Sequence, residues 1–243
     1  MQVSTGHSDL TQNKKFIAVI CGLKSEADAV VRAVGKSGIE IGVSGANASR
    51  AEELARVACH NGVAAIISVG VSGGLDPALK PGDLVIGEEV IGDDGGRYES
   101  DRYLISAVAK ETAAAHAITG VLFGADEIIE TASKKATLFA NHEAIAVDME
   151  SHGAARAAAE AGIPFLAIRA IADPADRVLP PAALNAVAPD GSTRTMATLA
   201  AALRDPKQFP MLLKLGADSG AALKTLRRDL GPLFRRFFLS LDF

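Results

Sequence analysis

The sequence predicts an α/β protein of three layers, in which helices cover both faces of a central mixed β-sheet. Two patterns support this fold class. From Phe16 onward, short apolar segments alternate with alanine-rich segments of helical character. Several apolar segments lack a polar face, and such strands are covered by helices on both sides. At 243 residues, 49% of them hydrophobic, the chain can form one domain with a substantial core.

The predicted strands and helices follow one another along the chain. The strands cover residues 16–22, 39–45, 63–70, 82–92, 117–126, 143–149 and 163–173. The helices cover residues 25–34, 49–62 and 151–162. Ser25 is the expected N-cap of the first helix, with Asp28 three residues on, and Gly62 is placed to end the second.

The pattern changes after Pro180, where residues 196–205 and 209–230 are helical with no strand between them. Residues 1–14 are polar and aperiodic, which predicts a disordered N-terminal tail. We therefore expect a single domain over residues 15–243, with a helical C-terminal extension that begins at about residue 180.

Composition excludes several classes of function. A net charge of −4 disfavours nucleic-acid binding by charge alone. Cys21 and Cys59 form no CxxC, which argues against a disulfide framework and a zinc ribbon and fits a reducing compartment. The five histidines are scattered, so no metal site is expected. No apolar run reaches the ~18 residues of a membrane span. We expect a cytoplasmic protein without a metal cofactor.

Residues 70–74, GVSGG, match the GxSxG pattern of a serine-hydrolase elbow after a strand. An elbow continues directly into a helix, whereas Pro77 and Pro81 follow here. No histidine follows His152, so the order Ser, Asp, His is not available. We interpret the segment as a glycine-rich turn at the carboxyl end of a strand, where α/β sheets bind ligands. The alternative is a tight turn without a ligand.

Four acids lie at the predicted ends of strands: Glu26, Asp148, Glu150 and Asp173. Each also has a structural interpretation. Glu26 and Glu150 suit the first turn of a helix. Asp148 is a partner for Arg169, a charge within an apolar strand, and Asp173 can cap a turn. Convergence of several acids on one glycine-rich segment favours a functional site.

Sugar chemistry suits such a site. A carboxylate accepts hydrogen bonds from both hydroxyls of a ribose diol, and a buried, protonated carboxyl donates a proton to a leaving group. Met149 offers an apolar surface for a sugar face. Carboxylates also stabilise the oxocarbenium-like state of glycosidic cleavage.

Three segments resemble hallmarks of the nucleoside phosphorylase and nucleosidase superfamily, whose members cleave the N-glycosidic bond of nucleosides. They are residues 146–176 (AVDMESHGAARAAAEAGIPFLAIRAIADPAD), 68–86 (SVGVSGGLDPALKPGDLVI) and 123–130 (FGADEIIE). Order and spacing agree from about residue 16 to residue 176. The resemblance implies an enzyme with the nucleoside phosphorylase-like fold that forms a homo-oligomer.

The resemblance also implies roles for individual residues. Asp173 would be the acid near N7 of adenine, and Glu26 would hold the attacking water. Glu150 would bind the ribose hydroxyls and Met149 would pack on the sugar. The implied lining comprises Asp148 as a supporting acid, the backbone of Ser72, Gly73 and Gly74, and the base-binding segment with Ile128 and Ile129.

Several positions depart from the superfamily pattern. Ala172 and Val71 stand where many relatives have serine, and Ile128 and Ile129 replace an aromatic residue that stacks on the base. Ser68 stands where one group of phosphorylases has a phosphate-binding arginine. The second substrate is therefore either water or phosphate. Phosphate would need Arg50 with Ser44 and Gly45, or an arginine from a neighbouring subunit, and no other cofactor is implied.

Residues 176–226 resemble the hopanoid-associated phosphorylase branch, which implies release of adenine from the lipid-linked nucleoside adenosylhopane during hopanoid biosynthesis. Two alternatives stay open. One is cleavage of soluble nucleosides, as by a methylthioadenosine/S-adenosylhomocysteine nucleosidase or a purine nucleoside phosphorylase. The other is a non-catalytic nucleoside-binding protein.

Residues 227–243, RRDLGPLFRRFFLSLDF, combine aromatic residues with four arginines. Such a segment can lie on an anionic membrane surface, which would place the protein peripherally at the inner membrane. The alternative is a helix that docks on the core or on another subunit.

Overall fold

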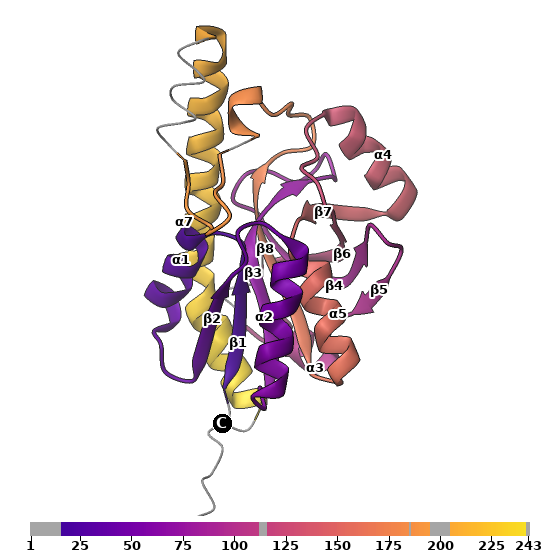
Figure 1. Cartoon of the computed structure of the whole chain (residues 1–243), viewed down its shortest axis with the longest axis vertical. Helices are drawn as coiled ribbons and strands as arrows, with labels where there is room; N and C mark the ends of the chain where they lie inside the picture. The colour runs from indigo at the N-terminus through magenta and orange to yellow at the C-terminus, as the bar shows by residue number, and fades with distance from the viewer. Residues whose placement is uncertain (1–15, 112–115, 185, 195–204, 242–243) are drawn as a thin grey trace, which may run out of the picture.

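A mixed β-sheet forms the centre of the computed structural model, which describes residues 16–111, 116–184, 186–194 and 205–241 (Figure 1). Eight strands are found in these residues. They are β1 (Ile17–Cys21), β2 (Ile39–Val43), β3 (Ala65–Gly74), β4 (Leu84–Gly92), β5 (Arg97–Glu99), β6 (Ile118–Gly124), β7 (Ala144–Asp148) and β8 (Phe165–Asp173).

The strand order is β2-β1-β3-β7-β6-β4-β5, and β8 pairs with both β3 and β4. The strands β3, β8, β4, β6 and β7 thereby pair in a closed ring, from which β1, β2 and β5 extend. β1, β3 and β8 are parallel, so their carboxyl ends lie at one edge of the sheet. β7 crosses the end of β3, where Val147 pairs with Gly73. Residues just after β7 therefore reach the same edge.

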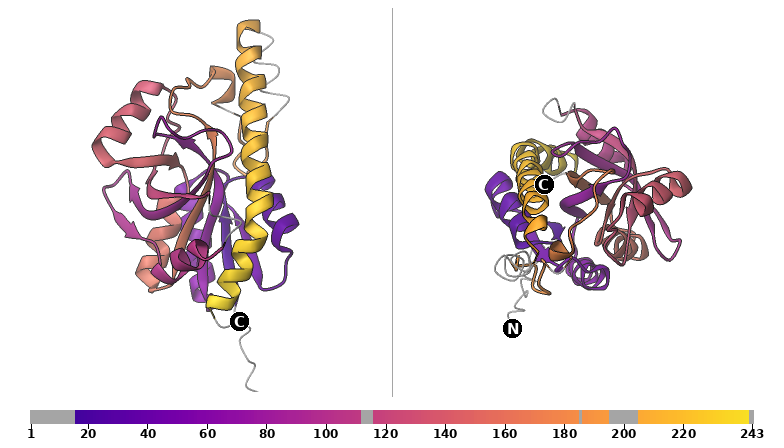
Figure 2. Two further views of the ribbon diagram at one scale, coloured as in Figure 1. Left: turned by 180° about the vertical axis from the view of Figure 1, so that it is seen from behind. Right: turned by 90° about the horizontal axis from the view of Figure 1, so that it is seen from above.

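Helices cover both faces of this sheet, which confirms the expected α/β/α layers. They are α1 (Lys24–Val34), α2 (Ala48–His60), α3 (Arg102–Ala109), α4 (Ala132–His142), α5 (Ser151–Ala161) and α7 (Phe209–Ser240), with 3-10 turns η2 (Pro181–Ala183) and η3 (Pro206–Gln208). α1, α3 and α7 cover one face, and α2 and α5 cover the other. Seen from behind, α7 runs along the whole length of the molecule (Figure 2).

The side chains of β1 explain why apolar strands without a polar face form here. Ile17, Val19 and Cys21 point into the core under α1 and α7, whereas Ala18 and Ile20 point into the core under α2 and α5. Successive side chains of a strand alternate between its two faces. A strand with helices on both sides must therefore be apolar at every position.

The glycine-rich segment was expected to be a turn after residue 70, and this expectation is wrong. Gly70 to Gly74 continue β3, pairing with β8 and at the end with β7. A loop and then β4 follow, not the helix that a hydrolase elbow requires. The extra pairing partners explain the longer strand, because they supply backbone hydrogen bonds that local sequence does not reveal.

The start of α1 also differs from the expectation. The helix begins at Lys24 with Leu23 in the N-cap position, so Ser25 lies inside it and does not cap it. The backbone N–H of Leu23 donates to the Glu26 carboxylate at 2.8 Å. Glu26, rather than Asp28, therefore satisfies the donor that the helix leaves open.

The C-terminal helix α7 continues beyond the predicted residue 230 and packs on the core. Its second half buries Leu226, Leu230, Leu233, Phe234 and Phe237 in the core that α7 shares with β3, β8, α1 and α3. The segment from residue 227 to Leu241 is thus docked, with its aromatic residues turned largely inward. The expected tail 1–14 and nearly all of the expected helix 196–205 lie outside the described residues.

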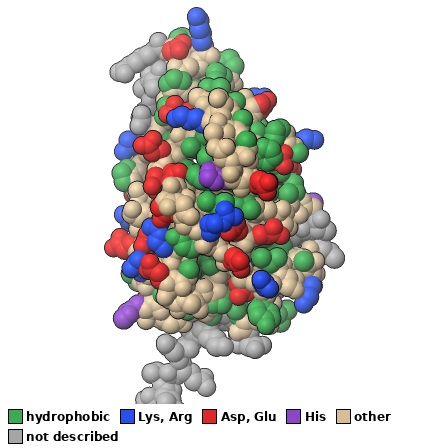
Figure 3. All heavy atoms as spheres, turned by 90° about the vertical axis from the view of Figure 1, so that its right-hand side faces the viewer, with side chains coloured by type: hydrophobic (Ala, Val, Ile, Leu, Met, Phe, Trp, Pro, Cys, Tyr) green, Lys and Arg blue, Asp and Glu red, His purple; other side chains and the backbone are tan. Residues whose placement is uncertain are grey.

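Charged side chains of both signs mix on the face that carries α4 and β5, on the right of Figure 1 (Figure 3). Within the described residues, no helix is both long and apolar enough to cross a membrane.

Candidate active site

A cavity of about 400 Å³ lies where β1, β3, β7 and β8 end. It brings together residues from nine separate segments of the chain. Of the predicted site residues, it is lined by Glu26, Asp148, Met149, Glu150 and Asp173, by Ser72 and Gly73 of β3, by Ile128 and Ile129, and by Gly45. The acids that the sequence placed at strand ends thus share one cavity.

Glu26 is buried at the floor of this cavity, with only 2% of the residue exposed. One carboxylate oxygen accepts a hydrogen bond from the N–H of Val71, and the other accepts from the N–H of Leu23, both at 2.8 Å. Gly70 leaves room for it, since a Cβ there would lie 3.0 Å from Glu26 Oε1. Burial raises the pKa of Glu26, and the backbone hydrogen bonds oppose that shift.

Asp148 is tied to the backbone and to Arg169, as the sequence interpretation expected. Its Oδ2 accepts from Arg169 Nε at 2.9 Å, and its Oδ1 accepts from the N–H groups of Glu150 and Ser151 at 2.8 and 2.7 Å. Burial alone would raise the pKa of Asp148, but the Arg169 guanidinium and these N–H groups lower it below its ordinary value. Asp148 is therefore a fixed carboxylate that shapes the turn carrying Glu150.

Arg169 completes this buried group. Its Nη2 donates to the hydroxyl of Ser68 at 2.7 Å and its Nη1 to the carbonyl of Ile168 at 2.9 Å. Ser68, the position at which some phosphorylases have an arginine, thus serves the ion pair and does not line the cavity.

Glu150 faces the cavity at the N-terminus of α5. It lies opposite Gly22, where an added Cβ would overlap the Glu150 carboxyl group. Burial, together with the negative charges of Asp148 and Glu26, raises the pKa of Glu150 to about 8. At neutral pH Glu150 is therefore mainly protonated.

Asp173 ends β8 and forms an ion pair with Lys135 of α4. Lys135 Nζ lies 2.5 Å from Asp173 Oδ2 and donates a second hydrogen bond to the carbonyl of Pro174 at 2.8 Å. Asp173 Oδ1 has no hydrogen-bond partner among the described residues, and Arg177 Nε lies 3.8 Å from it. Burial raises the pKa of Asp173, and Lys135 opposes that shift.

The opposite side of the cavity is apolar. Leu179, Leu184 and Val187 come from the segment after β8, and Leu215 comes from the first half of α7 together with Ser219. These residues surround the acids with a surface that has few hydrogen-bonding groups. The arrangement suits a ligand with one polar part and one apolar part.

Two of the expected phosphate ligands lie in an adjoining cavity. Ser44 and Arg50 line a space of about 630 Å³ with Arg194, and only Gly45 of the expected set also lines the cavity with the acids. Gly74 lies outside both cavities, because its missing side chain faces Ile171 and Leu79. The structure thus brings Ser72 and Gly73, but not Gly74, into the lining of the cavity with the acids.

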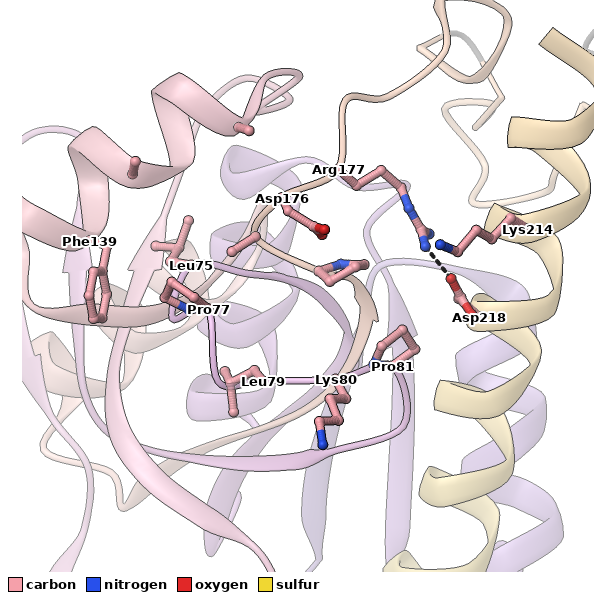
Figure 4. A pocket seen from close by; sticks show the side chains of 14 residues that line it. Leu75, Pro77, Leu79, Lys80, Pro81, Phe139, Asp176, Arg177, Lys214 and Asp218 are labelled. Atoms are coloured by element: carbon pink, nitrogen blue, oxygen red, sulfur yellow. Dashed lines mark hydrogen bonds and ion pairs between the residues drawn. The ribbon is translucent and has the colours of Figure 1, made fainter.

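A further cavity of about 730 Å³ lies beyond Pro174, between α4 and α7 (Figure 4). Arg177 crosses from the end of β8 to Asp218 of α7, with Lys214 beside them (Figure 4). Apolar residues such as Leu75, Leu79 and Phe139 form the other side. Its lining includes none of Glu26, Glu150 and Asp173, so the chemistry belongs to the smaller cavity.

A family model decides which group this fold and site belong to. The model of the phosphorylase superfamily matches residues 15–204. The chain belongs to the phosphorylase superfamily. A curated relative, the 5'-methylthioadenosine/S-adenosylhomocysteine nucleosidase of Geobacillus kaustophilus (strain HTA426), is 32% identical over 129 residues. This match covers 44% of the chain and 54% of the relative, so the chain spans about half the length of that relative.

Solved structures share the fold of this phosphorylase-superfamily chain at low sequence identity. One is the 5'-methylthioadenosine/S-adenosylhomocysteine nucleosidase of Colwellia psychrerythraea 34H in complex with adenine, with a TM-score of 0.69 and 18% identity over 93% of this chain and 96% of that one. Another is the native futalosine hydrolase of Helicobacter pylori, with a TM-score of 0.66 and 18% identity over 88% and 97%. The expected fold class is thereby confirmed.

Sequence reasoning missed several residues of this phosphorylase-superfamily site. Lys135 lies in "SKKA", which is typical of an exposed helix, and no pattern separates it from Lys134. The apolar residues 179, 184, 187 and 215 lie in residues 176–226, whose resemblance to the hopanoid-associated branch does not single them out as lining residues. Leu23 lines the cavity and donates its backbone N–H to Glu26, and no sequence pattern indicates either role.

Proposed function

We propose that this chain hydrolyses the N-glycosidic bond of an adenine nucleoside. The observation that carries the proposal is the meeting of Glu26, Glu150 and Asp173 in one cavity of about 400 Å³. Glycosidic cleavage needs an acid for the leaving group, a base for the attacking oxygen and a group that orients the sugar. The three carboxyl groups can fill these three roles.

Each role follows from a residue's surroundings. Asp173, whose pKa is raised by burial, takes up a proton from water at its unpartnered Oδ1 and passes it to N7 of the purine, so that the bond from C1' to N9 breaks with its electrons moving to the base. Glu26, held by two backbone N–H groups, takes a proton from the water that attacks C1'. Glu150 accepts hydrogen bonds from the ribose hydroxyls once it is ionised, and Met149 packs on the sugar.

Charge favours water over phosphate as the nucleophile. Among the described residues that line the cavity, the one cationic side chain is Lys135, and it is paired with Asp173. A phosphate dianion would therefore find no unpaired cation among the described residues of this lining to balance its charge. Ser44 and Arg50 remain the alternative phosphate ligands, in the adjoining cavity.

For the group attached to the ribose we propose a hydrophobic lipid, as in adenosylhopane. The support is the apolar surface of Leu179, Leu184, Val187 and Leu215, most of it from residues 176–226, the segment that resembles the hopanoid-associated branch. A small apolar substituent, as in 5'-methylthioadenosine, is the second candidate, because the same surface can cover it and the curated relative is named for that nucleoside.

The test is release of adenine from adenosylhopane and from 5'-methylthioadenosine, each with and without phosphate, by wild type and by Asp173→Asn. We expect phosphate-independent release that falls by about 100-fold or more in Asp173→Asn. Asp176→Asn is the matched control, since Asp176 lies three residues on and faces the larger cavity (Figure 4). Wild type that binds both nucleosides but cleaves neither would identify a non-catalytic binding protein.

We further propose that the enzyme acts as a homo-oligomer. We also propose that its C-terminal segment, residues 227–243, packs on the core of the protein and does not bind a membrane. Burial of Phe234 and Phe237 supports the docked role. Light scattering after size-exclusion chromatography measures the assembly. Sedimentation with anionic liposomes tests the segment, and liposome binding that is lost on deletion of residues 239–243 would favour the membrane.

A further inference from the structure

Lys135 occupies a position that an exposed helix does not explain. It is the one residue of α4 that is buried, with no exposed surface, while the neighbouring Lys134 is exposed. Burying an ammonium group is unfavourable unless it is paired and hydrogen-bonded. An apolar side chain at this position would anchor α4 without that cost, so the charge itself calls for an explanation.

Lys135 makes the two carboxyl oxygens of Asp173 different, because it contacts Oδ2 and not Oδ1. Nζ donates to Oδ2 at 2.5 Å and to the carbonyl of Pro174 at 2.8 Å, so that Oδ2 is held towards α4. Oδ1 is left without a hydrogen bond in the described residues. Lys135 and Asp173 both line the cavity with the other acids.

Charges on other elements contribute less to this carboxyl group. Arg177 Nε lies 3.8 Å from Oδ1, and the Arg177 guanidinium is itself bound to Asp218 of α7. Asp176 adds a weak opposing charge. The direct, hydrogen-bonded contact of a cation with Asp173 therefore comes from Lys135.

We propose that Lys135 is a positioning residue for the acid: it orients Asp173 so that Oδ1 meets the leaving base, and its charge balances the carboxylate that remains after proton transfer. In this step the Oδ1–H bond breaks and the N7–H bond forms, while Lys135 keeps its protons and its hydrogen bond to Oδ2. A cation beside the conjugate base makes a buried carboxyl group a stronger acid in the transition state. This inference rests on the proposed function, in which Asp173 is the acid.

The test compares two leaving groups in the full-length Lys135→Met variant. Release of adenine from 5'-methylthioadenosine needs an acid, whereas release of nitrophenolate from 4-nitrophenyl β-D-ribofuranoside needs none. We expect the rate at saturating substrate to fall about 100-fold or more for adenine and to stay within a few-fold of wild type for nitrophenolate. Lys134→Met, one residue away and exposed, should leave both rates unchanged.

The pH profile separates this role from a structural one. Without the cation, burial dominates and the pKa of Asp173 rises further, so Asp173 stays protonated to a higher pH. The rate at saturating nucleoside falls at alkaline pH as Asp173 loses its proton. In Lys135→Met the midpoint of this alkaline limb should therefore lie about one pH unit or more higher than in wild type. A helix anchor would leave that limb in place.

Three outcomes overturn the inference or its basis. Equal losses with both leaving groups, or an unmoved alkaline limb, overturn the role of Lys135 while wild-type adenine release upholds the proposed function. Wild type that releases no adenine from any adenine nucleoside overturns the proposed function and this inference with it. If Lys135→Met does not fold, Lys135→Gln, which keeps a donor for Oδ2 but not the charge, is measured and interpreted in the same way.

Discussion

Arg169 Nε lies 2.9 Å from Asp148 Oδ2, and both side chains are 1% exposed. This pair lies directly behind the turn that carries Glu150, because Asp148 also accepts from the N–H groups of Glu150 and Ser151. The geometry of the Glu150 carboxyl group therefore depends on an ion pair whose two side chains are almost completely buried.

Removal of Arg169 should destabilise the protein strongly. Arg169→Met leaves the Asp148 carboxylate buried without its partner, and breaking a buried pair in this way costs about 3–5 kcal/mol. Urea denaturation at pH 7 measures the free energy of unfolding. Arg97→Met is the control, since Arg97 pairs with Glu89 near the surface, where such pairs contribute roughly 0–1 kcal/mol. Equal losses in the two variants would contradict the prediction.

Glu150 should make the protein less stable as the pH rises. Its pKa is about 8 in the folded chain against 4.5 for the free group. Between these values the unfolded chain ionises Glu150 while the folded chain keeps it protonated, so unfolding releases a proton and becomes easier with increasing pH. The Glu150→Gln variant lacks this titration.

The measurement is urea denaturation of wild type and Glu150→Gln at several pH values from 5 to 8. We expect the variant's advantage in free energy of unfolding to grow across this range, by on the order of 1–3 kcal/mol. An advantage that does not change with pH would show that Glu150 ionises normally in the folded state.

Gly22→Ala should remove activity without unfolding the protein. A Cβ at residue 22 overlaps the Glu150 carboxyl group, which must then move away from the ribose position. A displacement of about 1 Å in such a site costs about 100-fold in rate. Gly216→Ala in α7 is the control, because its Cβ meets no atom within 4 Å. Circular dichroism verifies folding, and full activity of Gly22→Ala would disprove the close approach.

Phe234→Ala should be among the most destabilising single changes in α7. Phe234 is fully buried and its ring centroid lies 5.4 Å from that of Phe237. Truncation of a buried phenylalanine costs about 3–5 kcal/mol. Leu239→Ala, at a position 73% exposed, should stay within about 0.5 kcal/mol of wild type. If the aromatic segment instead served a membrane, the two variants would unfold at similar urea concentrations.

The sequence was sufficient for the layers and for the location of the acids, since both follow from local patterns. Strands such as β1 are apolar on both faces, and the carboxyl ends of parallel strands meet at one edge. Even the partner of Asp148 was predictable, because a lone arginine in an apolar strand requires a counter-ion.

Other features depend on contacts that local sequence does not encode. The sequence did not predict α4, because most of its side chains are exposed and they form no apolar stripe. Lys135 cannot be distinguished from Lys134 in the sequence, since its burial depends on its contact with Asp173 of β8. The end of β3 looked like a turn because glycines rarely form strands, yet pairing with β7 and β8 holds Gly73 and Gly74 in place. The apolar residues opposite the acids become neighbours only when α7 crosses the sheet.

The length of α7 links the shape of the cavity to the packing of the core. Leu215 lines the cavity and Phe234 is buried in the core, 19 residues further along one continuous helix. At ~1.5 Å per residue these positions are about 28 Å apart. A rotation of the helix by about one degree around Phe234 would therefore shift Leu215 by about 0.5 Å. Substitutions deep in the core, far from the cavity, can therefore widen or narrow its apolar side by tilting this one helix.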